Sequence, residues 1–122
     1  QQLKLEGIKE SPLNIAVFYT PPTQPVLGQT SMVEPGEYSV VCAVQNMWLM
    51  ARALNIGMGW VSILDPDTVK RLLNTPPEYK LVAYLCLGYV HEFLDQPELE
   101  ILQWEQRKPA QSGIHHERFR PD

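Results

Sequence analysis

With 122 residues, of which 44% are hydrophobic, the chain has the size of one modest domain and enough apolar side chains for a core. Its formal charge of −4, with its 10 basic residues scattered along the sequence, gives no basic stripe for a nucleic-acid backbone, so we exclude nucleic acid as a partner. We find no apolar stretch long enough to span a bilayer and no signal peptide, and we therefore expect a soluble, cytoplasmic protein with no membrane partner.

The two cysteines, Cys42 and Cys86, both lie inside apolar runs. Small secreted domains place their disulfide-forming cysteines in loops instead. We therefore expect no disulfide, and we interpret both residues as buried thiols that pack like small hydrophobic side chains.

The first nineteen residues predict the end of a helix followed by a strand. Residues 1–10 mix apolar and charged side chains, and Ser11-Pro12 ends the helix because the residue before a proline avoids helical angles. Since the sequence starts inside this helical pattern and without a methionine, we expect residues 1–122 to be the C-terminal part of a longer domain whose N-terminal half is absent. Residues 13–19 are apolar and partly β-branched, which predicts a buried strand.

A long loop and a long helix follow. Residues 20–37 are too rich in proline and glycine for a helix interior or a central strand, and their apolar side chains favour a lid or a subunit contact. Residues 38–55 predict a helix that is apolar nearly all round, which requires cover from a missing half or a second subunit. We place its end at residues 55–57, where Asn55 is a suitable left-handed terminator.

The second half of the chain predicts two more strands and two short helices. Residues 57–63 indicate a turn into a strand, and Asp65, Pro66 and Asp67 indicate the N-cap and first turn of a helix that ends at Asn74. Residues 81–90 are almost continuously apolar, as in a central strand buried on both faces. A last short helix over residues 98–104 and a polar tail over residues 107–122 complete an α/β or α+β domain built on one sheet.

Several kinds of site are absent from the sequence. There is no glycine-rich phosphate loop with its lysine and no nucleophile elbow. His91 is isolated and His115-His116 lie together in the tail, so we expect no metal site. The turn at residues 57–62 and Arg107 remain as candidates. From the residues alone, tight helix-to-strand packing is the better explanation of the turn, and an arginine such as Arg107 is more often solvated than bound to a phosphate.

Five segments, in order, resemble motifs of the nitroreductase superfamily, and most narrowly the flavin-destroying 5,6-dimethylbenzimidazole synthases. The resemblance implies an α+β nitroreductase-like fold, with a central mixed sheet flanked by helices, in an intertwined homodimer. The two FMN sites of such a dimer lie at the subunit interface. The segments are residues 11–14, 38–63, 81–90, 96–100 and 104–109.

The resemblance also assigns roles to individual residues. Trp60, Val61 and Ser62 are expected to lie along the flavin ring, with Ser62 as the catalytic residue that positions the oxygen chemistry. Other nitroreductases usually carry glycine at this position, so Ser62 distinguishes the two branches. Arg107 matches the arginine that binds the FMN phosphate. A catalytic aspartate and further phosphate-binding arginines belong to the half that precedes this chain.

The activity that the resemblance implies is the oxygen-dependent fragmentation of reduced FMN to 5,6-dimethylbenzimidazole, the lower ligand of cobalamin. FMN and molecular oxygen are then the small-molecule partners, and NAD(P)H is a candidate electron donor. One alternative is an NAD(P)H-dependent FMN nitroreductase or a flavin or corrinoid reductase. A second alternative is a truncated, non-catalytic module that dimerises or binds flavin.

Overall fold

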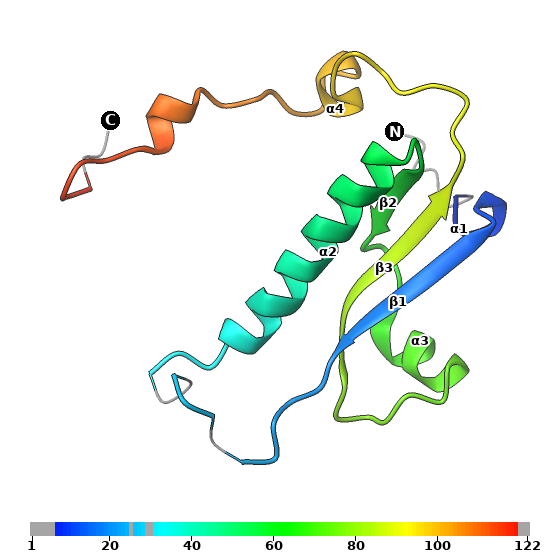
Figure 1. The fold of residues 1–122 in the computed structure, drawn as a ribbon, viewed down its shortest axis with the longest axis vertical. Helices are drawn as coiled ribbons and strands as arrows, with labels where there is room; N and C mark the ends of the chain where they lie inside the picture. The colour runs from blue at the N-terminus through cyan, green and yellow to red at the C-terminus, as the bar shows by residue number, and fades with distance from the viewer. Residues whose placement is uncertain (1–6, 25, 29–30, 120–122) are drawn as a thin grey trace. The chain divides into compact units, whose positions relative to one another are not determined.

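The computed structural model describes residues 7–24, 26–28 and 31–119 (Figure 1), which fall into two compact units, Gln1–His91 and Glu92–Asp122. We describe each unit by itself. Of the helix expected over residues 1–10, the end is seen at Gly7–Glu10, and residues 1–6 lie outside the described residues. The first unit contains α1 (Gly7–Glu10), β1 (Leu13–Tyr19), α2 (Pro35–Ala53), β2 (Gly57–Val61), α3 (Pro66–Leu72) and β3 (Lys80–Gly88), and the second contains α4 (Glu98–Ile101) and the 3-10 turn η1 (Ala110–Gly113).

The three strands form one sheet in the order β1-β3-β2, with β3 in the middle. Leu85 of β3 lies opposite Ile15 of β1 and Trp60 of β2, and both strand pairs are antiparallel. The predicted α+β class is thus confirmed. The described strands include no parallel pair of the expected mixed sheet, because both neighbours of β3 run against it.

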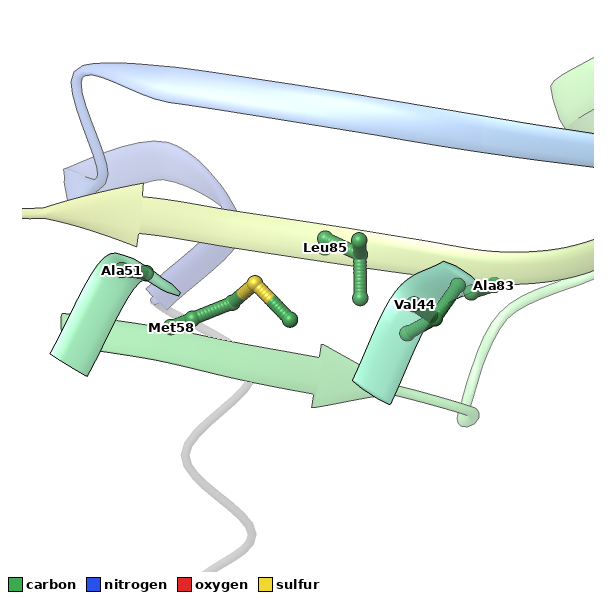
Figure 2. Packing of buried hydrophobic residues seen from close by; sticks show 5 residues of the cluster. All are labelled: Val44, Ala51, Met58, Ala83 and Leu85. Atoms are coloured by element: carbon green, nitrogen blue, oxygen red, sulfur yellow. The ribbon is translucent and has the colours of Figure 1, made fainter. Parts of the chain in front are cut away.

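The core of the first unit is a small apolar cluster between α2 and one face of the sheet (Figure 2). Alternation along β3 turns Ala83 and Leu85 toward α2, and Leu85 is 0% exposed. From the helix, Val44 and Ala51 meet them because they lie two turns apart on one side of α2, while Met58 enters from β2. Helix α2 contacts all three strands, so this cluster joins the helix to the whole sheet.

Burial of β3 is less complete in this chain than the sequence predicts, whereas the open apolar surface of α2 agrees with the expectation that this helix needs cover from elsewhere. The expectation that β3 is buried on both faces was wrong for this chain, because its fully buried side chains, Ala83 and Leu85, share one face. On α2 only Val44 and Ala51 are buried. Much of the rest of that helix stays open, as shown by Tyr38, Leu49, Met50 and Leu54, which are 53%, 61%, 61% and 60% exposed.

Both cysteines are free, but the prediction that both are buried was wrong. Cys42 is exposed and Cys86 is half-buried. The reason lies in helix geometry, since Cys42 is two residues from Val44 and therefore points away from the sheet side of α2. Its apolar neighbours in the sequence do not show which side of the helix the sheet covers.

Helix α2 begins at Pro35, earlier than the predicted start at residue 38. The long proline-rich loop therefore ends at Glu34. A proline is tolerated in the first turn of a helix, where its missing N–H has no intrahelical partner to lose. In the same turn, Glu37 forms an ion pair with Lys80 at the start of β3, at 2.6 Å between Oε2 and Nζ. This pair ties the beginning of α2 to the sheet.

Three helices end with a non-glycine residue at positive φ, namely Asn55 after α2, Asn74 after α3 and Gln103 after α4. After α2 the N–H of Ile56 donates to the carbonyl oxygen of Ala51 at 2.8 Å, which is the bond that closes a Schellman motif. The predicted terminators Asn55 and Asn74 are confirmed. The last helix was predicted to reach residue 104, but the left-handed conformation of Gln103 confines it to residues 98–101.

The other predicted elements agree with the structure within a few residues. The strand over residues 13–19 matches β1, and the strand predicted over 81–90 appears as β3 over Lys80–Gly88. Strand β2 begins at Gly57 itself, so the turn before it lies within residues 54–56. Among the residues that the structure describes, no helix combines the length and the apolar character needed to cross a bilayer.

Candidate functional site

The site predicted from the sequence lies at the end of β2. Trp60 and Val61 are the last two residues of the strand, and Ser62 follows directly. Because strand residues alternate between faces, Trp60 lies on the side of Met58 and α2, whereas Val61 lies on the opposite side. Trp60 is nevertheless 38% exposed, which is a large apolar surface for an indole so close to the core.

Beside these residues lies a hollow of about 170 Å³, which we call the β2-end hollow. It forms because β2 stops pairing with β3 at Val61 opposite Tyr84, while β3 extends back to Lys80. Its volume is below the 300–1,000 Å³ typical of a drug-sized ligand site, so it can accommodate part of a cofactor but not the whole. The hollow is lined by Trp60, Val61, Ser62, Leu64, Pro66 and residues 81–84.

Two features leave the backbone around this hollow accessible to a ligand. Ser62 is exposed, and within the described part of the chain its hydroxyl has no hydrogen-bond partner. At Gly59, a Cβ in place of the α-hydrogen would meet no heavy atom within 4 Å, so open space lies next to the strand. A planar ring system could therefore approach the strand closely, and the Ser62 hydroxyl could donate a hydrogen bond to it.

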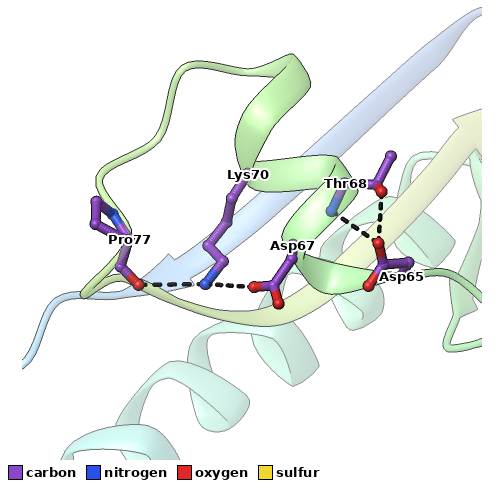
Figure 3. A network of polar contacts seen from close by, with 5 residues as sticks. All are labelled: Asp65, Asp67, Thr68, Lys70 and Pro77. Carbon is purple, nitrogen blue, oxygen red and sulfur yellow. Dashed lines mark hydrogen bonds and ion pairs between the residues drawn. The ribbon is translucent and has the colours of Figure 1, made fainter.

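The turn that carries Ser62 is fixed at its far end by Asp65, the N-cap of α3 (Figure 3). Oδ2 of Asp65 accepts a hydrogen bond from the Thr68 N–H at 3.0 Å and another from the Thr68 hydroxyl. These two bonds, the hydroxyl bond foremost, lower the pKa of Asp65 below its ordinary value of 3.8. As predicted, Asp65 is a capping residue, and its hydrogen-bonding capacity is used for that purpose.

A second set of contacts holds α3 to the loop that leads into β3 (Figure 3). Nζ of Lys70 pairs with Oδ1 of Asp67 at 2.9 Å and also donates to the carbonyl oxygen of Pro77 at 3.2 Å. Asp65 therefore caps the helix that follows the turn, and Asp67 pairs with the lysine that holds α3 to the loop before β3. Neither acts as a free carboxylate facing a ligand.

Arg107 lies in the second unit. Its backbone N–H donates to Oε1 of Glu100 at 3.0 Å, and its Nε lies 3.7 Å from the same oxygen. The Arg107 side chain is 76% exposed. The structure thus brings Trp60, Val61 and Ser62 together in the first unit, and it does not relate Arg107 to them.

The sequence did not single out several residues that belong to these surroundings. Tyr84, Val82 and Leu64 line the β2-end hollow, and Glu100 binds Arg107. Tyr84 enters through the register of β2 on β3, which the sequence does not specify. The sequence indicates only weakly that Glu100 pairs with Arg107, since an acidic residue at the end of a short helix comes shortly before the arginine.

Among residues 7–24, 26–28 and 31–119, no group of three or more His, Cys, Asp or Glu side chains is arranged to hold a metal ion. The described residues at the β2-end hollow instead offer apolar and aromatic side chains together with two that carry a hydroxyl, Ser62 and Tyr84. Such a surface suits an aromatic ring with a polar edge.

Comparison with known proteins identifies a family and several relatives. The model of a family described as the nitroreductase family matches residues 1–89. A protein of Rhodospirillum rubrum named 5,6-dimethylbenzimidazole synthase is 50% identical over 110 residues, covering 88% of this chain and 52% of that protein. One of the same name from Rhodobacter capsulatus is 45% identical over 112 residues, covering 89% of this chain and 54% of that protein. The chain thus spans about half the length of the curated relatives it matches.

Solved structures share the fold. A nitroreductase family protein from Clostridium difficile superposes with a TM-score of 0.67 at 22% identity, covering 92% of this chain and 63% of that one. A nitroreductase family protein from Clostridium novyi superposes with a TM-score of 0.59 at 24% identity, covering 69% of this chain and 46% of that one. At these identities the likeness concerns the fold alone.

The Asp65 cap gives a prediction about pH. Because the folded-state pKa of Asp65 is lowered, its contribution to stability is present above pH 3.8 and is lost as the pH falls through the lowered pKa. We expect Asp65→Ala to lower the melting temperature at neutral pH. The difference in melting temperature between this variant and the unmodified protein should shrink on acidification. The control Asp65→Asn keeps a neutral acceptor and should not show this acid-dependent loss. Thermal melts that show the same gap between Asp65→Ala and the unmodified protein at about pH 2 as at neutral pH contradict the assignment.

Proposed function

The chain belongs to the nitroreductase family, and from this premise we propose that it forms the flavin-edge part of an enzyme that fragments reduced FMN with molecular oxygen. The product is 5,6-dimethylbenzimidazole, the lower ligand of cobalamin. The observation that carries the proposal is the β2-end hollow, where an exposed tryptophan lies beside a serine hydroxyl that has no partner among the described residues. The identity of 50% and 45% to two proteins named 5,6-dimethylbenzimidazole synthase supports the choice of product.

The residues present suit FMN as the ligand. The flavin ring is planar and aromatic, and the end of β2 offers apolar surface for one edge of it on either face, through the exposed indole of Trp60 on one and through Val61 with the open space beside Gly59 on the other. The phosphate of FMN requires a cation, and the guanidinium of Arg107 can bind a phosphate through two parallel hydrogen bonds. The small volume of the hollow means that other chain segments must complete the site.

Reduced FMN, when bound, supplies the electrons that oxygen accepts, and its own ring is the material that is broken down. The residues of this chain orient and shield that chemistry. Trp60 and Val61, which lie on opposite faces of β2, shield from water the edge of the ring that meets the end of the strand. Ser62 acts as the catalytic residue, because its hydroxyl donates a hydrogen bond to oxygen at the reactive edge and is small enough to leave room for it.

We also propose that the protein is a homodimer in which each FMN site is completed at the subunit interface. Support comes from α2, whose side away from the sheet exposes large apolar residues such as Leu49 and Met50. An exposed apolar surface of this kind marks an interaction site more often than a solvated one. NAD(P)H as electron donor and the cytoplasm as location are further parts of the proposal, and both rest on the family likeness.

Replacing Arg107 by alanine tests the phosphate contact. The substitution should weaken FMN binding by about 2 kcal/mol, the range for hydrogen bonds between charged groups. Riboflavin, which has the same ring and no phosphate, should bind equally well to both proteins. Isothermal titration with the two ligands provides the measurement, and equal losses for FMN and riboflavin would show that Arg107 acts through folding.

Replacing Ser62 by glycine tests the reaction itself. With reduced FMN and air, the variant should still oxidise flavin but should form 5,6-dimethylbenzimidazole on the order of 10²-fold more slowly, the cost of losing one positioned donor. Ser62→Thr keeps the hydroxyl and should retain most of the product. Mass spectrometry of the products makes the comparison. Undiminished product from Ser62→Gly removes Ser62 from the mechanism, and an unmodified protein that turns over flavin without this product is a reductase instead.

A further inference from the structure

Glu100 makes two contacts with Arg107 through one oxygen atom. Oε1 accepts a hydrogen bond from the Arg107 backbone N–H at 3.0 Å and lies 3.7 Å from Nε of the guanidinium. The Glu100 side chain is only 25% exposed, whereas that of Arg107 is 76% exposed. The carboxylate is therefore the sheltered and fixed partner of the pair, and the guanidinium is the accessible one.

These contacts leave most of the guanidinium available for a ligand. An arginine side chain has five N–H donors in a planar fork. The separation of 3.7 Å between Nε and Oε1 is an ion pair longer than a hydrogen bond, and within the described residues the Arg107 side chain has no other hydrogen bond or ion pair. The two terminal nitrogens, which form the forked edge that matches a phosphate, remain without a protein partner in the described part of the chain.

We propose that Glu100 is a positioning residue for Arg107, which holds its backbone and the near end of its guanidinium so that the forked edge faces a phosphate monoester. This inference rests on the proposed function, in which that phosphate belongs to FMN. Arginine has about 2 kcal/mol of rotamer entropy to lose on binding, and a carboxylate that restrains the side chain beforehand reduces this loss.

Glu100 has an opposing effect on the same ligand, because its negative charge repels a phosphate. The sign of the effect on binding therefore decides which role dominates. A positioning residue strengthens phosphate binding, so that its removal weakens FMN. A counter-charge that competes with the ligand weakens phosphate binding, so that its removal tightens FMN.

The test compares FMN and riboflavin binding in three variants of the protein. Glu100→Ala should weaken FMN about fivefold, the equivalent of one net hydrogen bond, and leave riboflavin unchanged. Glu100→Gln should bind FMN at least as well as the unmodified protein, because its amide oxygen can accept the same backbone N–H without a negative charge. Glu98→Ala is the control. It removes from the same helix a carboxylate that does not contact Arg107, and it should change neither affinity.

Four results overturn the inference. Tighter FMN binding by Glu100→Ala shows a competing counter-charge, and equal weakening of FMN and riboflavin shows a purely structural role. If Glu100→Ala leaves FMN binding unchanged while Arg107→Ala weakens FMN binding alone, Glu100 does not position Arg107. The phosphate contact of Arg107 then still stands. If Arg107→Ala itself does not distinguish FMN from riboflavin, the phosphate assignment of the proposed function fails together with the role of Glu100.

Discussion

The packing of one side of α2 against one face of β3 is the interaction on which the first unit depends. Val44 and Ala51 on the helix meet Ala83 and Leu85 on the strand, and Met58 closes the cluster from β2. No other cluster of fully buried side chains exists in the described residues, so the sheet and the long helix are held in place by this contact. A core this small stabilises the arrangement and leaves large apolar surfaces of the same helix without cover.

The same contact fixes the candidate site. Met58 anchors β2 in the core two residues before Trp60, and Asp65 caps α3 three residues after Ser62. The segment between these two fixed points is short, which limits the positions that Val61 and Ser62 can adopt. Val61 and Ser62 therefore line the β2-end hollow as a consequence of the fold.

Local features of the sequence predicted much of this structure. The β1 strand, the Asp65 cap and the left-handed Asn55 each depend on a few neighbouring residues, and each was predicted correctly. Features that depend on distant residues were missed. The exposure of Cys42 follows from which side of α2 the sheet covers, and the place of Tyr84 in the hollow follows from the strand register, neither of which neighbouring residues determine.

The central claim is that this chain provides one part of a flavin site that a second copy completes, so dimerisation and FMN binding must be coupled. Leu49→Glu with Met50→Glu places two charges on the uncovered side of α2, and neither residue lines the β2-end hollow. Light scattering and FMN titration of this double variant test the coupling. We expect the unmodified protein to be a dimer that binds FMN, and the variant to lose both properties together. A folded, monomeric variant that binds FMN with unchanged affinity would contradict the claim.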